Sequence, residues 1–293
     1  MKITCENEMG DNITFAYKFP YWLEEIEGIY GVKSEVTTVN NALTDGEIYV
    51  GNNVEKRNIV ITAKVYNNHE NTRELLEKLF APYIKGTLTY YYNNSNNSYR
   101  TIKYYVENFD MTFKGNLRTI TVSLICPDPM FYGETNYYYM LQTIGLIHFP
   151  IYVNQPFQVT NYKRQEFINV LNFSPTEQGL IFRITALLDS IPLNFYPDIA
   201  NLNTGEHITL DTVEMEESLK KGEYIEISTL FGNKYIDLIR GDKRYRMNSM
   251  WKAGNTWIQA HKGDNVFRLS TALTISPNAL NLTIIHTPSY WRV

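Results

Sequence analysis

The sequence is short of the features that mark secreted, disulfide-linked or membrane-spanning proteins. It has two cysteines in 293 residues, Cys5 and Cys126, and both lie in strand-like sequence. Two cysteines over this length do not make a disulfide scaffold, so we expect reduced thiols in a protein folded in the cytoplasm. No apolar signal core follows the first methionine. The longest apolar passage, 144–153, is broken by His148 and Pro150 and is far short of the ~20 residues of a membrane helix.

Charge is scarce as well. Charged residues make up 20% of the chain and the net charge is −4, whereas soluble proteins average ~25% charged residues. The chain has no broad basic field to neutralise phosphates, so nucleic-acid binding is disfavoured. We therefore expect a soluble protein that does not insert into membranes and that leaves the cell by lysis or as part of a particle.

The patterns that accompany catalysis are also missing. The sequence has no Gly-x-Ser-x-Gly elbow, phosphate loop or dinucleotide fingerprint. None of its five histidines has a partner at metal-ligand spacing. The acidic runs at 24–27 and 214–217 place neighbouring carboxylates in different directions, which is typical of solvated surface and not of a glycosidase pair. We expect Cys126 to be an inert core thiol. The prediction is a chain without enzyme activity, cofactor or metal.

The chain is rich in strand-like sequence and in tyrosine, with 23 tyrosines. Residues 118–126 alternate apolar and polar side chains, the period of a half-buried strand, and then run into Pro127-Asp128-Pro129. Proline donates no backbone hydrogen bond, so the chain has to leave the sheet there and carries Phe131 and Tyr132 with it. This break falls near the middle of the sequence and predicts a domain boundary.

The two halves have different patterns. The first half reads as strands interrupted by one helix, with Asn71 as its N-cap, an apolar stripe at helical spacing, and Pro82 as its stop. From about residue 151 short strands alternate with turns every ~8–12 residues, which is typical of a sandwich or barrel. A weak helix candidate lies at 211–221. We predict a first domain over 1–135, a linker over 136–150 and a second domain over 151–293.

The strand that ends in Cys126-Pro127-Asp128-Pro129 resembles the end of the N-terminal domain of distal tail proteins, which form baseplate rings in tailed phages and phage-tail-like particles. Further similarities follow along nearly the whole chain, namely the Asp45-Gly46 turn, the Arg57-x-Ile59-x-Ile61 strand, the turn at 203–206, the strand at 225–229 and the C-terminal segment 287–293, which resembles the family's last strand. The resemblance implies a mainly β fold, with a barrel-like N-terminal domain carrying one short helix and a C-terminal galectin-like β-sandwich.

The resemblance also implies a function without chemistry. The first domain is expected to close into a hexameric ring that continues the tail tube, and the second to project from it. The implied partners are further copies of the chain, the tail tube protein and the tail hub or tip protein, all located in a virion or tail-like particle. No catalytic residue is carried over, because the family has none.

Two sets of aromatic residues are candidate contacts. Tyrosine offers a large apolar body with a polar tip and is enriched at interfaces. We therefore consider subunit or inter-domain contacts for Tyr90, Tyr92, Phe131 and Tyr132. The alternative function is a carbohydrate-binding module that contacts the host cell surface. For that alternative the candidate sugar contacts are Trp251 and Trp257, although core packing remains a competing interpretation of both indoles.

Overall fold

The computed structural model describes residues 1–40, 45–66, 70–92, 98–114, 117–145, 160–174, 176–272, 275 and 278–293. The chain forms two compact units, which we describe separately. The first comprises Met1–Glu134 together with Ser289–Val293, and the second comprises Thr135–Pro288. The predicted boundaries differ from this division in two places. Strands occupy the beginning of the segment predicted as a linker, and the last five residues join the first unit.

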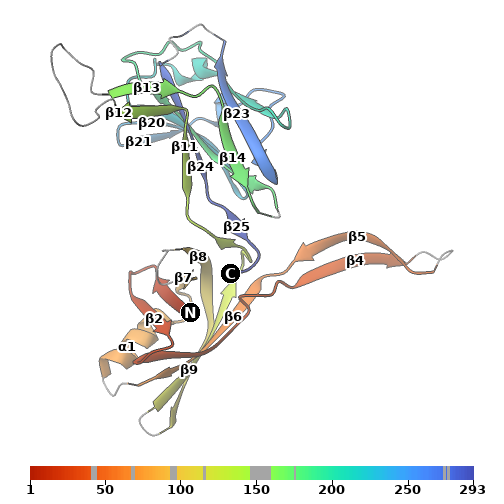
Figure 1. Cartoon of the computed structure of the whole chain (residues 1–293), viewed down its shortest axis with the longest axis vertical. Coiled ribbons are helices and arrows are strands. Elements are labelled where there is room, and N and C mark those ends of the chain that lie inside the picture. The colour runs from red at the N-terminus through yellow and green to blue at the C-terminus, as the bar shows by residue number, and fades with distance from the viewer. Residues whose placement is uncertain are drawn as a thin grey trace. The chain divides into compact units, whose positions relative to one another are not determined.

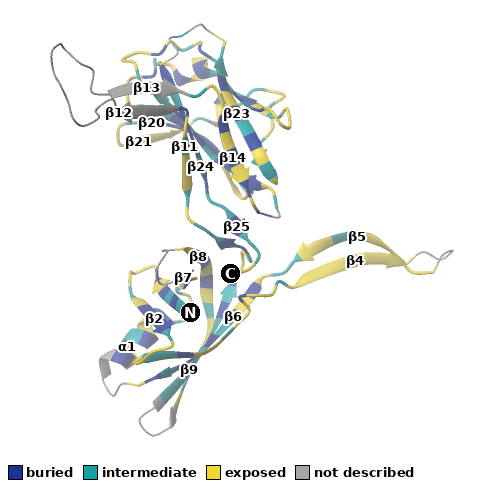
Figure 2. Ribbon diagram, viewed as in Figure 1, coloured by how far each residue is buried: buried dark blue, intermediate teal, exposed yellow. Residues whose placement is uncertain are grey.

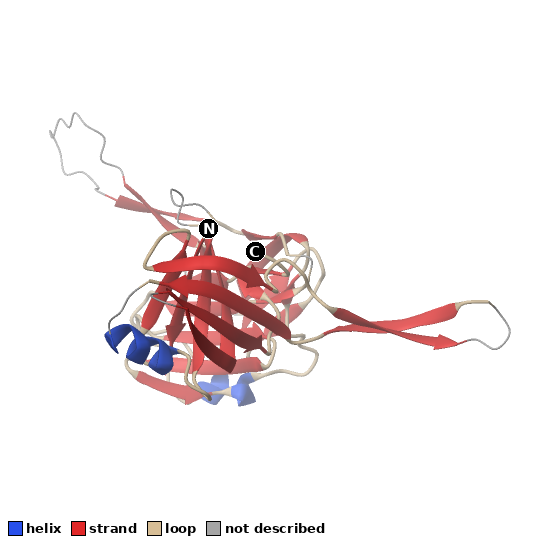
Figure 3. Ribbon diagram, turned by 90° about the horizontal axis from the view of Figure 1, so that it is seen from below, coloured by secondary structure: helices blue, strands red, loops and turns tan. Residues whose placement is uncertain are grey.

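The first unit is a closed barrel. Seven strands follow one another around it, and the last pairs with the first: β8 (Tyr99–Lys114), β7 (Lys85–Tyr91), β1 (Lys2–Asn7), β2 (Asn12–Ala16), β3 (Tyr21–Glu27), β6 (Arg57–Val65) and β9 (Leu117–Cys126). Neighbouring strands are antiparallel except β2 and β3, which meet in parallel through Ala16 and Trp22. Figure 3 shows these strands in red. The barrel-like N-terminal domain is therefore confirmed.

Alternation in the sequence decides which side chains fill the barrel. Along β6 every second residue is buried, and along β9 the buried set includes Ile120 and Val122. The two strands pair so that Ile61 lies opposite Val122 and Arg57 lies opposite Cys126. A register shift of one residue would turn all of these side chains outward, so the apolar alternation fixes the pairing.

One α-helix accompanies the barrel. Helix α1 (Glu70–Leu79) buries Leu76 and Leu79 in the barrel core and is the only α-helix in the described ranges. Asn71 lies inside this helix and is not its cap, because the helix already includes Glu70. Phe80 follows the last turn and stacks on Phe109 of β8, with ring centres 5.7 Å apart. Within the described residues, no helix is long and apolar enough to cross a membrane.

Two pairs of strands extend the first unit beyond the barrel. Strands β4 (Ser34–Asn40) and β5 (Glu47–Val54) form a separate two-stranded ribbon that reaches away from it (Figure 1). Strands β10 (Phe131–Tyr132) and β25 (Ser289–Tyr290) continue the sheet past β8. β25 comes from the end of the chain, so the first unit is completed only by residues that follow the whole second unit.

The second unit is a sandwich of two sheets. The larger has the order β11 (Asn136–Tyr139), β24 (Leu280–His286), β16 (Ile181–Ala186), β19 (Tyr224–Leu230), β20 (Asn233–Arg240) and β21 (Lys243–Arg246). The smaller has the order β14 (Ile168–Asn172), β23 (Gly263–Thr271), β17 (Pro197–Asn201) and β18 (His207–Thr209). Short pairs join β12 (Leu141–Gly145) to β13 (Thr160–Arg164) and β15 (Gln178–Gly179) to β22 (Gln259–Ala260).

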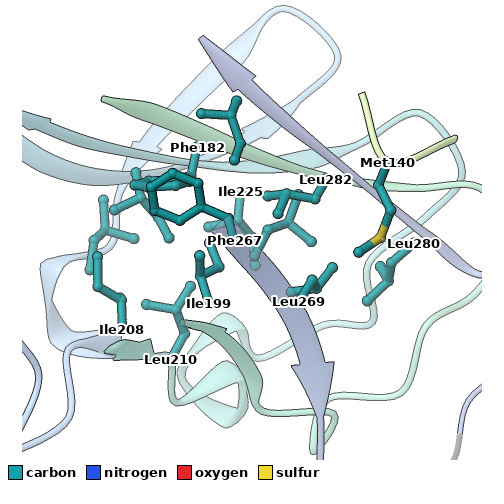
Figure 4. Packing of buried hydrophobic residues seen from close by; sticks show 14 of the residues in the cluster. Met140, Phe182, Ile199, Ile208, Leu210, Ile225, Phe267, Leu269, Leu280 and Leu282 are labelled. Carbon is teal, nitrogen blue, oxygen red and sulfur yellow. The ribbon is translucent and has the colours of Figure 1, made fainter. Parts of the chain in front are cut away.

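The core of this sandwich lies between the sheets. Phe182 of β16 meets Phe267 of β23 edge to face, with ring centres 5.5 Å apart. Figure 4 shows aliphatic side chains from both sheets around this pair. The predicted helix at 211–221 is only a 3₁₀ turn, η1 (Thr212–Met215), and Leu219 then bridges to Ile191. A second 3₁₀ turn is η2 (Asn248–Met250). The mainly β fold is thus confirmed in both units.

Candidate functional site

The described residues give little support to a chemical site. They contain no group of three or more His, Cys, Asp or Glu side chains arranged to hold a metal ion. Cys5 and Cys126 are both buried and unbonded. Burial raises the pKa of the Cys126 thiol to about 12, so the thiolate that nucleophilic chemistry needs is not formed at neutral pH.

Two histidines have structural partners instead. His261 lies between two carboxylates, with Nδ1 2.9 Å from Glu177 and Nε2 3.0 Å from Glu206. His286 is buried, and its Nε2 lies 2.6 Å from the amide oxygen of Gln178. Both contacts join neighbouring strands or turns of the second unit, so each histidine has a structural role there.

The most prominent surface feature is the β4–β5 ribbon, which we call the arm. Every residue of β4 is exposed, as are most of β5 (Figure 2). Val39 lies opposite Ile48, and a β-bulge beside Thr37 and Thr38 adds Val50 to the same region of β5. The side chains of these three apolar residues are each more than half exposed. The arm therefore presents an uncovered apolar stripe along a single hairpin.

Such a stripe is unusual for a hairpin that stands alone. An isolated two-stranded hairpin is at best marginally stable in water, and contiguous exposed apolar residues mark interaction sites. Polar contacts brace the arm at intervals. Lys33 pairs with Glu55 at 3.1 Å at the base, and Tyr49 donates a hydrogen bond to Asn52 at 3.0 Å. Glu47 accepts a hydrogen bond from Thr38 near the tip. The polar contacts fix the shape of the arm and leave its apolar stripe uncovered.

A hollow lies where the arm joins the barrel. It is open to solvent, with a volume of about 640 Å³, and its lining includes Gly31, Val32, Asn58, Glu107 and Ile125. Residues from the base of the arm share this lining with residues from the barrel strands β6, β8 and β9. The arm and the hollow together form the candidate interaction site of the first unit.

Hydrophobic periodicity does not predict this site. The sequence shows the Asp45-Gly46 turn, but the strands beside it carry valine, threonine and asparagine without a buried face. The sequence feature that could have indicated the site is the β-branched residues on both sides of a hairpin turn. Among the described residues of the hairpin, no other apolar residues are placed to pack against them. Such a pattern indicates a ribbon whose cover comes from another molecule.

The four aromatic residues predicted as contacts separate into two groups. Tyr90 and Phe131 are 8% and 0% exposed and pack in the barrel core, so within this chain both rings contribute to the core. A contact of either residue with another subunit stays a prediction. Tyr92 is 42% exposed and packs edge to face on Tyr90 at 5.2 Å. Tyr132 is partly buried, and its hydroxyl donates to Asp128 at 2.6 Å. Burial and that hydrogen bond raise the pKa of Tyr132.

Tyr92 belongs to a small aromatic and cationic group. The Arg100 guanidinium lies 4.9 Å from the Tyr92 ring centre and 3.7 Å from that of Tyr290. Arg100 also donates a hydrogen bond to the carbonyl of Arg292. The exposed tyrosine therefore sits beside the returning C-terminal strand, and part of its surface is already used within the first unit.

The two tryptophans proposed as sugar contacts do lie together. Trp251 and Trp257 stack with ring centres 4.2 Å apart and planes inclined by 23°. Both also pack against the sandwich core, and Lys234 lies 5.6 Å from the centre of Trp257. Each indole thus has one face covered by the other. A sugar ring that stacks on tryptophan needs an open face. The stacked arrangement therefore favours a packing role for the two tryptophans over a role in sugar binding.

Comparisons with known proteins identify solved structures that share this fold. No protein family model matches the sequence, and no curated protein matches it. Among solved structures, the chain is similar to the Dit protein of phage SPP1, a paradigm of the hub adsorption apparatus in phages that infect Gram-positive bacteria. That similarity covers 98% of both chains with a TM-score of 0.64 at 13% identity. The baseplate of phage p2, in its activated conformation with Ca, gives a TM-score of 0.50 at 9% identity over 98% of both chains. At these identities the likeness concerns the fold, and the fold is the one that the sequence resemblance to distal tail proteins implies.

Proposed function

We propose that this chain is a structural component of the tail tip or baseplate of a tailed phage or phage-tail-like particle. The observation that carries the proposal is the arm, whose apolar stripe is left uncovered by its own chain. The arm belongs to a chain that shares its fold, over 98% of its length, with a hub protein of a phage adsorption apparatus. A protein of this kind acts by binding its neighbours and performs no reaction.

The arm and the hollow at its base suggest how copies associate. An interface between two different surfaces of the same chain repeats from copy to copy, and it closes into a ring when the rotation fits. The arm supplies a projecting surface, and the barrel supplies the surface that receives it. We assign self-association to the first unit on this basis and expect a hexameric ring. The tail tube protein and the hub protein are its proposed partners.

Substitutions on the arm test this proposal. Val39→Thr, Ile48→Thr and Val50→Thr together keep β-branched side chains suited to a strand but remove much of the apolar stripe. We expect the unaltered chain to form higher-order species in size exclusion with light scattering, and the triple variant to elute as a monomer with unchanged circular dichroism and melting temperature.

The matched control is Phe231→Thr, which removes an apolar side chain that is 98% exposed at the β19–β20 turn of the second unit. This variant should associate like the unaltered chain. Two results would contradict the proposal: an unaltered chain that stays monomeric up to the highest soluble concentration, or a triple variant that associates normally.

A further inference from the structure

The outer face of the larger sheet of the second unit carries a row of paired side chains. Backbone pairing places one residue from each of the six strands in line: Tyr139, Thr283, Arg183, Glu226, Asp237 and Arg246. Their sequence neighbours on these strands, such as Phe182 and Ile225, point into the sandwich core. The row therefore runs straight across the face of the sheet that is turned away from the core.

Two carboxylates stand side by side in this row. Glu226 and Asp237 are direct cross-strand partners, an arrangement that destabilises a sheet when both groups are charged. Both side chains are also strongly buried, at 10% and 1% exposed. Burial alone raises the pKa of Glu226, but hydrogen bonds from Arg183 and Tyr235 outweigh it, and the pKa is lowered. The Glu226 carboxylate is thus held charged by the groups around it.

Three arginines compensate this charge. Arg183 lies 2.7 Å from Glu226, and Arg244 lies 2.9 Å from the other oxygen of the same carboxylate. Arg244 also donates to Asp237, and Arg246 Nε lies 2.6 Å from Asp237 Oδ1, as an ion pair without hydrogen-bond alignment. Three guanidiniums face two carboxylates, so the cluster keeps one excess positive charge.

The carboxylates hold the guanidiniums in place without covering them. The side chains of Arg244 and Arg246 remain 52% and 57% exposed. Both guanidiniums also lie against the ring of Tyr235, at 4.8 and 4.9 Å from its centre. A guanidinium has five N–H donors in a planar fork that matches a carboxylate or a phosphate. The result is a pair of oriented cationic donors on an open surface.

We propose that this row binds a linear anionic polysaccharide, with Arg244 and Arg246 holding its carboxylate or phosphate oxygens. The excess positive charge is complementary to such a polymer. Across six strands the row spans about 24 Å, since neighbouring strands lie ~4.8 Å apart, and this length suits several sugar units. At the far end of the row, Tyr137 and Tyr139 are about half exposed and offer rings on which sugars stack.

Titration of the full chain with polymers of matched size, three polysaccharides and one acidic polypeptide, tests the proposal. The probes are polygalacturonate, phosphomannan, neutral dextran and poly-L-glutamate, each at low salt. We expect polygalacturonate or phosphomannan to bind, and the tighter of the two identifies the anionic group. Dextran should not bind. Equal affinity for poly-L-glutamate would overturn the proposal, because the occupant would then be an acidic polypeptide. Absence of binding to both anionic polysaccharides would overturn it as well.

Variants on strand β21 locate the binding. We expect Arg246→Gln to weaken binding roughly tenfold, as for one charge-assisted contact. Lys243→Gln is the matched control, since it removes one positive charge from the same strand at a position facing the other way. An equal loss in both variants would overturn the proposal. If Arg246→Gln lowers the melting temperature, Tyr139→Ser, which leaves the carboxylates paired, replaces it and should also weaken binding.

Discussion

The guanidinium carbon of Arg57 lies 4.9 Å from the centre of the Phe131 ring. Around this pair the same guanidinium donates to the carbonyls of Pro129 at 2.9 Å and Gly31 at 2.6 Å, and to that of Trp291. Burial lowers the pKa of Arg57, yet an arginine remains protonated in proteins. One buried cation therefore fixes the proline-rich exit from β9, the turn before the arm and the returning end of the chain.

Removing the ring from this arrangement should be costly. Phe131 is fully buried, so Phe131→Ala should lower the free energy of unfolding of the first unit by about 3–5 kcal/mol. Denaturant unfolding followed by tryptophan fluorescence measures this change. Phe231→Ala is the control, because that ring is 98% exposed and its loss should change stability by less than ~0.5 kcal/mol. Equal effects of the two substitutions would show that the Phe131 ring is not buried.

The Cys126 thiol should be chemically silent in the folded protein. Burial raises its pKa to about 12, so almost none of it is thiolate at pH 8. Iodoacetamide at pH 8 should leave both cysteines unmodified until denaturant is added, as intact mass reports. Cys126→Ser should destabilise the chain more than Cys126→Ala, since it buries an additional polar group. Rapid labelling of the folded chain would contradict this and reopen the case for thiol chemistry.

His286 predicts a stability that depends on pH. Its burial lowers the pKa to about 4 from an ordinary 6.5, so the unfolded chain binds the extra proton first. The contribution of His286 to the free energy of unfolding should be constant above pH 6.5, fall between pH 6.5 and 4, and lose on the order of 3 kcal/mol across that window. Unfolding at a series of pH values measures it. The difference between the unaltered chain and His286→Gln, which does not titrate, isolates this contribution, and a flat difference would contradict it.

Local patterns in the sequence were enough to predict the barrel walls and the sandwich. The alternation in β9 correctly placed Ile120, Val122 and Cys126 inside, because a strand with one buried face has a period of two. The helix was also predicted from its apolar stripe, although its start lies earlier than Asn71. These elements share one property: each is specified by residues that are close together in the sequence.

Features that depend on distant residues could not be read in this way. β25 pairs with β10 across more than 150 residues, and the local sequence at Ser289 and Tyr290 does not indicate which strand it pairs with. The arm has no buried face, so periodicity gives no signal for it. The carboxylates Glu226 and Asp237 lie on different strands, and their proximity depends on the register of β19 and β20. Pairing between strands, and not the pattern within them, creates each of these sites.

The return of β25 determines how the first unit has to be isolated for a test of self-association. Residues 1–134 alone lack Tyr290, on which Arg100 stacks at 3.7 Å, and Trp291, whose carbonyl accepts from Arg57. Tyr132 pairs with Ser289 in an antiparallel ladder, so a short glycine-containing turn can join residues 1–133 directly to 288–293. We expect this joined chain to melt at a higher temperature than residues 1–134 alone.

The joined chain should also retain higher-order association, because it keeps the arm and the hollow at its base. Residues 135–288 carry neither, and they hold a complete sandwich core, so they should be folded and monomeric. Size exclusion with light scattering on both chains over a concentration series measures the difference. An isolated ring can be weak at low concentration, so the comparison is made at the highest soluble concentration of each. If residues 135–288 associate while the joined chain stays monomeric, the second unit and not the arm holds the self-association surface.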